Sequence, residues 1–278
     1  IEHTDGTRVV TASVHINFGL AAMDPLFAGL RLLRCEGALL LALSASSPFL
    51  DGRATGAHSQ RWLQFPLTPP QVPIFLNHPH YVRWMEEQLA AGSMHNVRHL
   101  WTSVRPNGDD RPHDLNRIEL RICDLIADPL ELLAVTAFAE LRLLQLLAEP
   151  ERFDPLLASR LTPQELAELA DANDRAAARS SLEAELCHWT TGEPILARDW
   201  IAAELEAMAP LAGSLGLGNL LPPLEMLLTR GNTAMRWLAL ERSGQPVAEI
   251  VAAEAAALEA REIALEACLA TDPAHALG

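Results

Sequence analysis

Residues 117–124 (RIELRICD) limit what this chain can fold into more than any other stretch. Within them Arg117, Glu119 and Arg121 alternate strictly with isoleucine and leucine. Because successive side chains of a β-strand point to opposite faces, this alternation predicts a half-buried strand. Its apolar face can pack on helices, while its other face carries one carboxylate between two guanidiniums.

A second stretch, residues 11–18 (TASVHINF), repeats the alternation. Its polar members are Thr11, Ser13, His15 and Asn17, and the residues between them are apolar. Side by side in one sheet, the two strands would form a polar floor of histidine, glutamate and arginine, which suits a divalent metal and a polyphosphate. The simpler interpretation is that these polar faces only meet water, as one face of many antiparallel sheets does.

The charge balance narrows the classes of partner. The chain has 278 residues, a formal net charge of -15 and no lysine, so every Lys/Arg position is an arginine. An acidic chain is a poor candidate for sequence-independent binding to nucleic acid, which needs a basic surface. Arginine binds phosphates and carboxylates as a two-pronged fork. Arginines cluster between Arg53 and Arg121, so we expect the first half to handle small anionic substrates, and we expect no nucleic-acid partner.

Cysteine spacing and hydropathy bear on the compartment. The four cysteines lie far apart, without the short spacing of a zinc or redox motif. This usage is typical of a reducing, cytoplasmic compartment. The sequence shows no signal peptide and no long uncharged apolar run, so we expect no membrane span.

Capping residues predict two helices in the first half. Asp24 followed by Pro25 predicts an N-cap and a first helical residue, with the helix running to residue 43. Asn77 opens a shorter amphipathic helix that Gly92 closes. The loop between these helices is rich in Gly, Ser and Arg, and such loops often contact substrates.

A third strand is expected over residues 97–104, joined by a turn to residues 117–124 as a hairpin. Everything after Asp128 is predicted to be helical. The clearest signal there is a capping box at residues 162–165. The later helices are expected over residues 197–215, 221–228, 233–242 and 247–269.

Four blocks of the sequence closely resemble the glutamate–cysteine ligases of the cyanobacterial type. These blocks are residues 11–17 (TASVHIN), 41–52 (LALSASSPFLDG), 96–108 (NVRHLWTSVRPNG) and 115–124 (LNRIELRICD). The resemblance continues through residues 162–189 and 230–234, so it covers nearly the whole chain. The wider family also includes carboxylate–amine ligases of other substrates.

The resemblance implies an α+β fold, a glutamine-synthetase-like catalytic domain whose curved, mainly antiparallel sheet is backed by helices. Residues 1–278 would form one domain, with a sheet-rich active-site part over 1–126 and a helical part over 127–278. The implied reaction joins the γ-carboxylate of glutamate to the amine of cysteine through an acyl phosphate, the first step of glutathione biosynthesis. Its substrates would be glutamate, cysteine and ATP, with Mg²⁺ as the cofactor.

The same resemblance assigns roles to single residues. Glu119 matches a metal-binding glutamate, and His15 lies where related ligases place a metal-binding histidine. Arg121 matches the arginine on the transferring phosphate, and Asn17 would also face ATP. Arg61 resembles the arginine that holds a glutamate carboxylate. The remaining substrate-binding candidates are Thr11, Ser13, Ser47, Arg98 and Arg105.

One departure from the family changes the expectation for activity. The family begins with a strand of the type Gly-x-Glu-x-Glu, whose carboxylates bind magnesium, and no such strand is found here. We therefore expect the chain to lack an N-terminal part and to be inactive alone. Two alternatives stay open: a ligase with a different amine acceptor, and a non-catalytic, mostly helical interaction protein whose polar strand faces are merely solvated.

Overall fold

A small antiparallel sheet carries the predicted polar floor. The computed structural model describes residues 12–64, 69, 71–94, 100–105 and 116–271. The sheet consists of β1 (Ile16–Gly19), β5 (Arg117–Leu120) and β4 (Thr102–Arg105), in the order β1-β5-β4. The predicted pairing of the two alternating stretches and the predicted β4–β5 hairpin are both confirmed.

The register puts polar residues in one row across the sheet. Asn17 on β1 lies opposite Glu119 on β5, and Glu119 lies opposite Ser103 on β4. Directly opposed residues of antiparallel strands share a face. The row Asn17–Glu119–Ser103 therefore belongs to the polar floor, as the alternation predicts.

The opposite face of the sheet packs on a helix. Ile118 and Leu120 are fully buried, and helix α1 (Met23–Cys35) contacts β4 and β5. The helix comes close at Gly29, where an added Cβ would lie 2.9 Å from the Ile118 side chain. The missing side chain of this glycine thus lets α1 approach the sheet.

The single helix expected from Asp24 to residue 43 is wrong in two respects. Helix α1 begins at Met23 with Ala22 as its N-cap. The chain then breaks at Glu36, and a second helix, α2 (Gly37–Ser44), follows. The Glu36 carboxylate is buried against the Arg142 guanidinium, a tertiary contact that local sequence signals do not carry.

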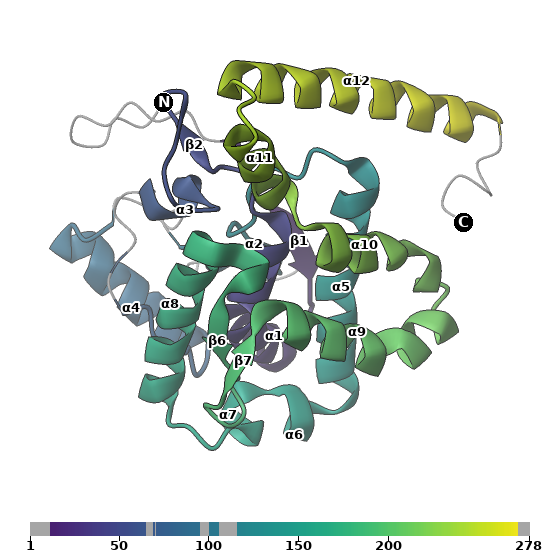
Figure 1. The fold of residues 1–278 in the computed structure, drawn as a ribbon. Coiled ribbons are helices and arrows are strands. Elements are labelled where there is room, and N and C mark those ends of the chain that lie inside the picture. Colours follow the sequence, from purple (N-terminus) through teal and green to yellow (C-terminus); the bar gives the residue numbers. More distant parts are fainter. Residues whose placement is uncertain (1–11, 65–68, 70, 95–99, 106–115, 272–278) are drawn as a thin grey trace.

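Helix α2 lies at the centre of the molecule, and all eight of its residues are buried. It contacts α5 (Pro129–Ala148), α8 (Pro163–Ser180) and α9 (Ala197–Ser214), which surround it in Figure 1. Because it is apolar all round, α2 suits a fully enclosed position.

The remaining helices cover this core. They are α3 (Gln60–Gln64), α4 (His78–Ala91), α6 (Pro150–Phe153), α7 (Pro155–Ala158), α10 (Pro222–Arg230), α11 (Thr233–Arg242) and α12 (Val247–Thr271), with 3-10 turns η3 (Ser181–Glu183) and η4 (Gly218–Leu220). The predicted helices near the C-terminus correspond to α9, α10, α11 and α12. Helix α12 lies on the outside of the molecule and contacts α11 (Figure 1).

The expectation that everything after Asp128 is helical is wrong at one place. Strands β6 (Glu185–Cys187) and β7 (Pro194–Leu196) form an antiparallel hairpin after α8. The Asn173 side chain of α8 bonds both to the Cys187 main-chain N–H and to its carbonyl, each at 2.8 Å. A further two-stranded hairpin, β2 (Phe49–Leu50) and β3 (Arg53–Ala54), follows α2.

The predicted capping signals are confirmed elsewhere. Asn77 caps α4, and Gly92 ends it in the left-handed conformation that suits glycine. Asp128 caps α5 by accepting from two main-chain N–H groups. Thr162 and Glu165 form the expected capping box at the start of α8.

Three buried arginines join distant parts of the chain. Arg31 pairs with Asp154, Arg34 with Asp171 and Asp174, and Arg142 with Glu36 and Glu204. A buried charge is tolerated when such a partner is present. These pairs therefore tie α1 and the α1–α2 break to residues of the second half. No helix in the described part of the chain is long and apolar enough to cross a bilayer.

Candidate active site

Three charged or titratable side chains meet on the polar floor. Arg121 places Nη1 3.4 Å from Glu119 Oε1 and 3.3 Å from His15 Nδ1. His15 Nδ1 lies 3.7 Å from the same Glu119 oxygen. The structure thus brings together the three residues that the sequence predicts for the metal and the phosphate.

Asn17 and Ser13 extend this cluster along β1 and the segment before it. Asn17 Oδ1 accepts a hydrogen bond from Arg117 Nε at 3.0 Å. Ser13 Oγ lies 3.2 Å from His15 Nε2. Both predicted residues therefore lie on the floor, beside the His15 and Arg117 side chains.

The hydroxyl of Ser103 is a further polar group on this face. Ser103 is fully buried, and its Oγ has no hydrogen-bond partner among the described residues. It lies opposite Glu119 in the strand register. Ser103 lies on the predicted third strand, residues 97–104, so its alternation with its neighbours Thr102 and Val104 could have placed it on a separate face from the sequence.

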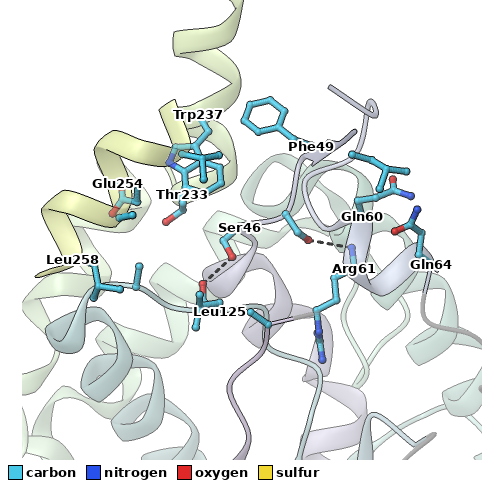
Figure 2. Close-up of a pocket in the computed structure, with 16 residues that line it drawn as sticks. Ser46, Phe49, Gln60, Arg61, Gln64, Leu125, Thr233, Trp237, Glu254 and Leu258 are labelled. Atoms are coloured by element: carbon cyan, nitrogen blue, oxygen red, sulfur yellow. Dashed lines mark hydrogen bonds between the residues drawn. The ribbon is translucent and has the colours of Figure 1, made fainter. Parts of the chain in front are cut away.

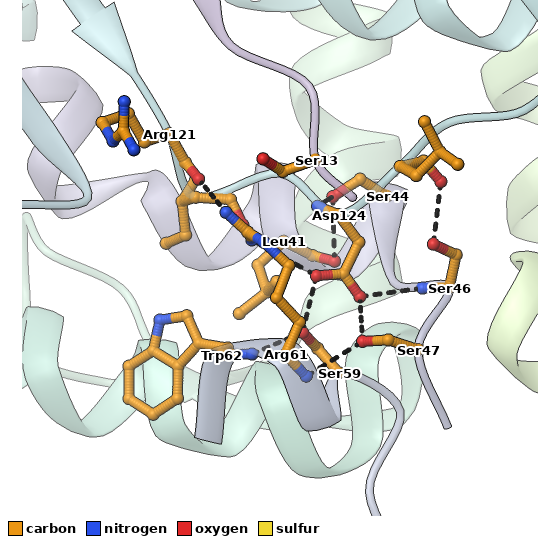
Figure 3. A network of polar contacts seen from close by, with 12 residues as sticks. Ser13, Leu41, Ser44, Ser46, Ser47, Ser59, Arg61, Trp62, Arg121 and Asp124 are labelled. Carbon is orange, nitrogen blue, oxygen red and sulfur yellow. Dashed lines mark hydrogen bonds and ion pairs between the residues drawn. The ribbon is translucent and has the colours of Figure 1, made fainter. Parts of the chain in front are cut away.

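A second polar network, centred on Asp124, lies directly beyond the end of β5 (Figure 3). Asp124 is fully buried. Oδ2 accepts from the Ser46 main-chain N–H at 3.0 Å and from Ser47 Oγ at 2.7 Å. Oδ1 accepts from Ser59 Oγ at 2.8 Å and from Arg61 Nη1 at 3.4 Å.

Arg61, expected to hold a substrate carboxylate, turns inward in the structure. Its Nη1 donates to the Ile122 carbonyl at 3.1 Å, and its Nη2 donates to the Arg121 carbonyl at 2.6 Å. The guanidinium also stacks over the Trp101 ring at 5.2 Å. Burial lowers the pKa of Arg61, and the Asp124 carboxylate opposes that shift. Both Nη groups are therefore used within the protein.

Ser47 and the main chain of Arg61 line a cavity of about 390 Å³. Ser47 Oγ accepts from the Arg61 main-chain N–H at 3.1 Å. Figure 2 shows Phe49 and Trp237 at one end of this cavity, Glu254 on α12 at its side, and the Arg61 guanidinium directed away from it. Most of the lining is apolar, so the cavity differs in character from the polar floor.

Three predicted residues cannot be placed on the floor by their side chains. Thr11 and Arg98 lie outside the described residues. The main chain of Arg105 pairs with Arg117 at the end of β4, and its side chain lies outside the described part. Their predicted substrate contacts stay predictions.

Sequence reasoning missed Asp124 and Ser59 as members of the site region. The signal for Asp124 is present in the alternation, because the residue falls on the apolar face with Ile118, Leu120 and Ile122. A carboxylate at an apolar position of a strand calls for a buried partner. Ser59 had no comparable signal, since serine is common in loops.

The metal-binding capacity of the described residues is limited. No cluster of three or more His, Cys, Asp or Glu side chains that could hold a metal occurs among them. Glu119 and His15 supply one carboxylate and one imidazole close together. Magnesium is commonly bound by one or two carboxylates together with substrate phosphates. Glu119 therefore fits an ion that arrives with a polyphosphate rather than a preformed metal cage.

The fold has a counterpart among solved structures. A crystal structure of glutamate–cysteine ligase from Francisella tularensis in complex with AMP superimposes with a TM-score of 0.58 at 12% sequence identity. The match covers 86% of this chain and 58% of that chain. At this identity the likeness establishes the α+β fold alone.

The sequence identifies the family. The chain belongs to glutamate–cysteine ligase family 2 (GCS2), whose family model matches residues 3–263. A relative from Frankia alni, provisionally named glutamate–cysteine ligase 2-1, is 30% identical over 84% of this chain and 59% of its own length. One from Gloeobacter violaceus, provisionally named glutamate–cysteine ligase 2, is 28% identical over 88% and 63%. The chain thus spans about three fifths of these relatives.

Proposed function

We propose that this chain belongs to an ATP-dependent ligase that joins the γ-carboxylate of glutamate to the amine of cysteine. The observation that supports this most is the meeting of His15, Glu119 and Arg121 on one sheet face, in a chain of the GCS2 family. The product would be γ-glutamylcysteine, as in the first step of glutathione biosynthesis. Because the chain spans three fifths of its relatives, the proposal concerns the whole protein to which it corresponds.

The proposed reaction has two steps. A glutamate carboxylate oxygen attacks the γ-phosphorus of ATP, and ADP leaves. The cysteine nitrogen then attacks the carbonyl carbon of the acyl phosphate, loses a proton, and phosphate leaves. Phosphoryl transfer depends mainly on positioning and on neutralising negative charge. The Arg121 guanidinium supplies the positive charge. Its position is restricted, because it lies beside the Glu119 carboxylate and both side chains are only partly exposed.

In this proposal each floor residue has one task. Arg121 donates to the transferring phosphoryl group, and Asn17 contacts ATP. Glu119 would hold Mg²⁺ that enters with ATP, and His15 would lie beside it as a second ligand. Magnesium would supply positive charge to the phosphates. Within the described residues Glu119 is the carboxylate beside His15, so this part of the protein would leave the other positions around the ion to phosphate oxygens, water or carboxylates from outside the described residues.

The substrate-binding roles of Ser13, Ser47, Thr11, Arg98 and Arg105 are proposed from the resemblance. Arg61 is different, because both of its Nη groups already donate to protein atoms. Its contacts support a structural role below the floor, while direct binding of glutamate stays a prediction. We also propose that residues 1–126 and 127–278 act as sheet-rich and helical parts of one catalytic domain.

Isothermal titration calorimetry of MgATP into the 278-residue chain tests the site without needing turnover. We expect Glu119→Gln and Arg121→Met each to weaken binding about 10-fold or more, because a hydrogen bond to a charged group contributes about 1.5–3 kcal/mol. The matched controls are Glu185→Gln, on the exposed side of strand β6, and Arg175→Met, on the exposed side of α8. If the two site variants bound MgATP as tightly as the two controls, the assignment of Glu119 and Arg121 to the site would be wrong.

Phosphate release from MgATP with glutamate, with and without cysteine, tests the reaction itself. We expect cysteine-dependent release from a full-length relative and no release from the 278-residue chain. Release with other amines but no preference for cysteine would favour the alternative acceptor. Steady glutamate- and cysteine-dependent release from the 278-residue chain would contradict the predicted inactivity.

A further inference from the structure

The fully buried carboxylate of Asp124 forms hydrogen bonds to two loops at the point where the chain leaves the floor strand β5. Asp124 accepts four hydrogen bonds, two at each oxygen, from donors in the segments around Ser46 and Ser59. Its main chain pairs with Ser13 in an isolated bridge, next to the strand pairing of β1 and β5. Asp124 is therefore held at the point where these segments meet (Figure 3).

From Asp124 a short chain of contacts leads to the floor. Asp124 Oδ1 faces Arg61 Nη1, and the other arm of this guanidinium donates to the Arg121 carbonyl at 2.6 Å. The Arg121 main-chain N–H is fixed as well, since it donates to the Trp101 carbonyl at 2.7 Å. The side chain of the same Arg121 carries the guanidinium beside Glu119 and His15.

We propose that Asp124 is a positioning residue for the polar floor: it orients the Arg61 guanidinium, which in turn fixes the main chain of Arg121 and so directs the Arg121 side chain toward Glu119. The use of this arrangement for nucleotide binding rests on the function proposed above. Asp124 itself touches no substrate in this assignment.

The chemistry of the network requires a carboxylate at this position. Asparagine would keep the shape but present an NH₂ group to one pair of donors. If that group faced the Ser59 and Arg61 side, it would oppose Arg61 Nη1, which can only donate. If it faced the other side, it would oppose the Ser46 main-chain N–H, which also can only donate. Either way one donor is left buried without its acceptor.

The chain offers a matched control for this substitution. Asp154 is also a buried aspartate, with 5% of its surface exposed, and it also pairs with a buried arginine, Arg31. Its other contact caps α7, and none of its hydrogen-bond partners among the described residues lies on the floor strands. Asp154→Asn therefore removes a comparable charge from a structural pair only.

Two measurements separate positioning from plain stability. The first is the affinity for MgATP by calorimetry, for parent, Asp124→Asn and Asp154→Asn. The second is hydrogen–deuterium exchange of residues 117–122, which needs no ligand. We expect Asp124→Asn to weaken MgATP binding about 10-fold or more, the scale seen for groups that orient a site from outside it, and to speed exchange at residues 117–122. Asp154→Asn should leave the MgATP affinity near the parent value, and any faster exchange caused by its lost ion pair should not be concentrated at residues 117–122.

Ser59→Ala is the milder variant if Asp124→Asn does not fold. It removes one donor to Asp124 Oδ1 and should speed exchange at residues 117–122 to a smaller degree. Exchange that is unchanged in the folded Asp124 or Ser59 variant, or changed equally in Asp154→Asn, would overturn the positioning role. A parent chain that binds no MgATP would contradict the site assigned to Glu119 and Arg121 instead, and the exchange data would still decide the role of Asp124.

Discussion

Replacing Arg142 with methionine should lower the free energy of unfolding more than almost any substitution on the surface. The side chains of Arg142 and Glu36 are each 2% exposed. Arg142 donates from Nε and Nη2 to the two Glu36 oxygens at 2.9 and 2.5 Å, and from Nη1 to Gln145 at 2.8 Å. Methionine fills similar space with a flexible apolar chain. Among the described residues it leaves the Glu36 carboxylate with one donor, Trp189 Nε1 at 3.0 Å, and it also removes the arginine partner of Glu204.

The size of the effect follows from that uncompensated charge. Removing one partner of a buried ion pair costs about 3–5 kcal/mol. At roughly 2–4 °C per kcal/mol for a chain of this size, the melting temperature should fall by roughly 6–20 °C. Replacing both charges of the Arg142–Glu36 pair is less harmful than removing one, so Glu36→Gln combined with Arg142→Met should be more stable than Arg142→Met alone. Glu204 loses Arg142 in both variants, so this loss does not affect the comparison between them.

Guanidinium chloride unfolding followed by circular dichroism measures these differences directly. The matched control is Arg152→Met, because the Arg152 and Glu149 side chains are 68% and 59% exposed and such surface pairs contribute about 0–1 kcal/mol. An Arg142→Met protein within 1 kcal/mol of the parent would refute the reasoning, and so would a double variant no more stable than the single one.

Two further predictions concern buried titratable groups. Burial, together with the neighbouring Asp171 carboxylate and against the attraction of Arg34, raises the pKa of Asp174 to about 7. The folded state then holds this proton more tightly than the unfolded chain, so the free energy of unfolding should fall as pH rises from about 4 to 7. Denaturant midpoints measured across this range should fall less steeply in Asp174→Asn than in the parent. An equal slope in the two proteins would contradict the raised pKa of Asp174. Burial also raises the pKa of Cys123 to about 11 and that of Cys35 well above its usual range. Both thiols should therefore resist a thiol reagent at pH 8 until the protein is denatured. Rapid labelling of either cysteine in the native protein, mapped by mass spectrometry, would count against its burial.

The sheet shows what a single sequence can predict. Strict alternation in two stretches predicts the pairing of β1 with β5 and the polar row that contains Asn17 and Glu119, because the period of a strand fixes its faces. The caps at Asn77, Asp128 and Thr162 were predictable for a similar reason. Each depends on residues within one helical turn.

The failures involve residues whose partners lie far along the chain. Glu36 lies at the break in the first predicted helix. Its carboxylate can be buried because it accepts hydrogen bonds from Arg142, 106 positions later. Arg61 has partners that the sequence did not indicate, since its guanidinium faces Asp124 and the Arg121 carbonyl, and its expected substrate contact stays a prediction. The β6–β7 hairpin is only three residues per strand, too short for alternation to distinguish it from the helical composition around it.

The long spans of the buried pairs also affect how this protein can be made. Arg31 is 123 positions from Asp154, Arg34 is 140 from Asp174, and Arg142 is 106 from Glu36. During synthesis Arg31, Arg34 and Glu36 emerge before their partners have been made, so these charged side chains must stay solvated by water. Helices α1 and α2 can therefore reach their enclosed state only after residue 174 has been added, and the nascent first half depends on staying soluble until then.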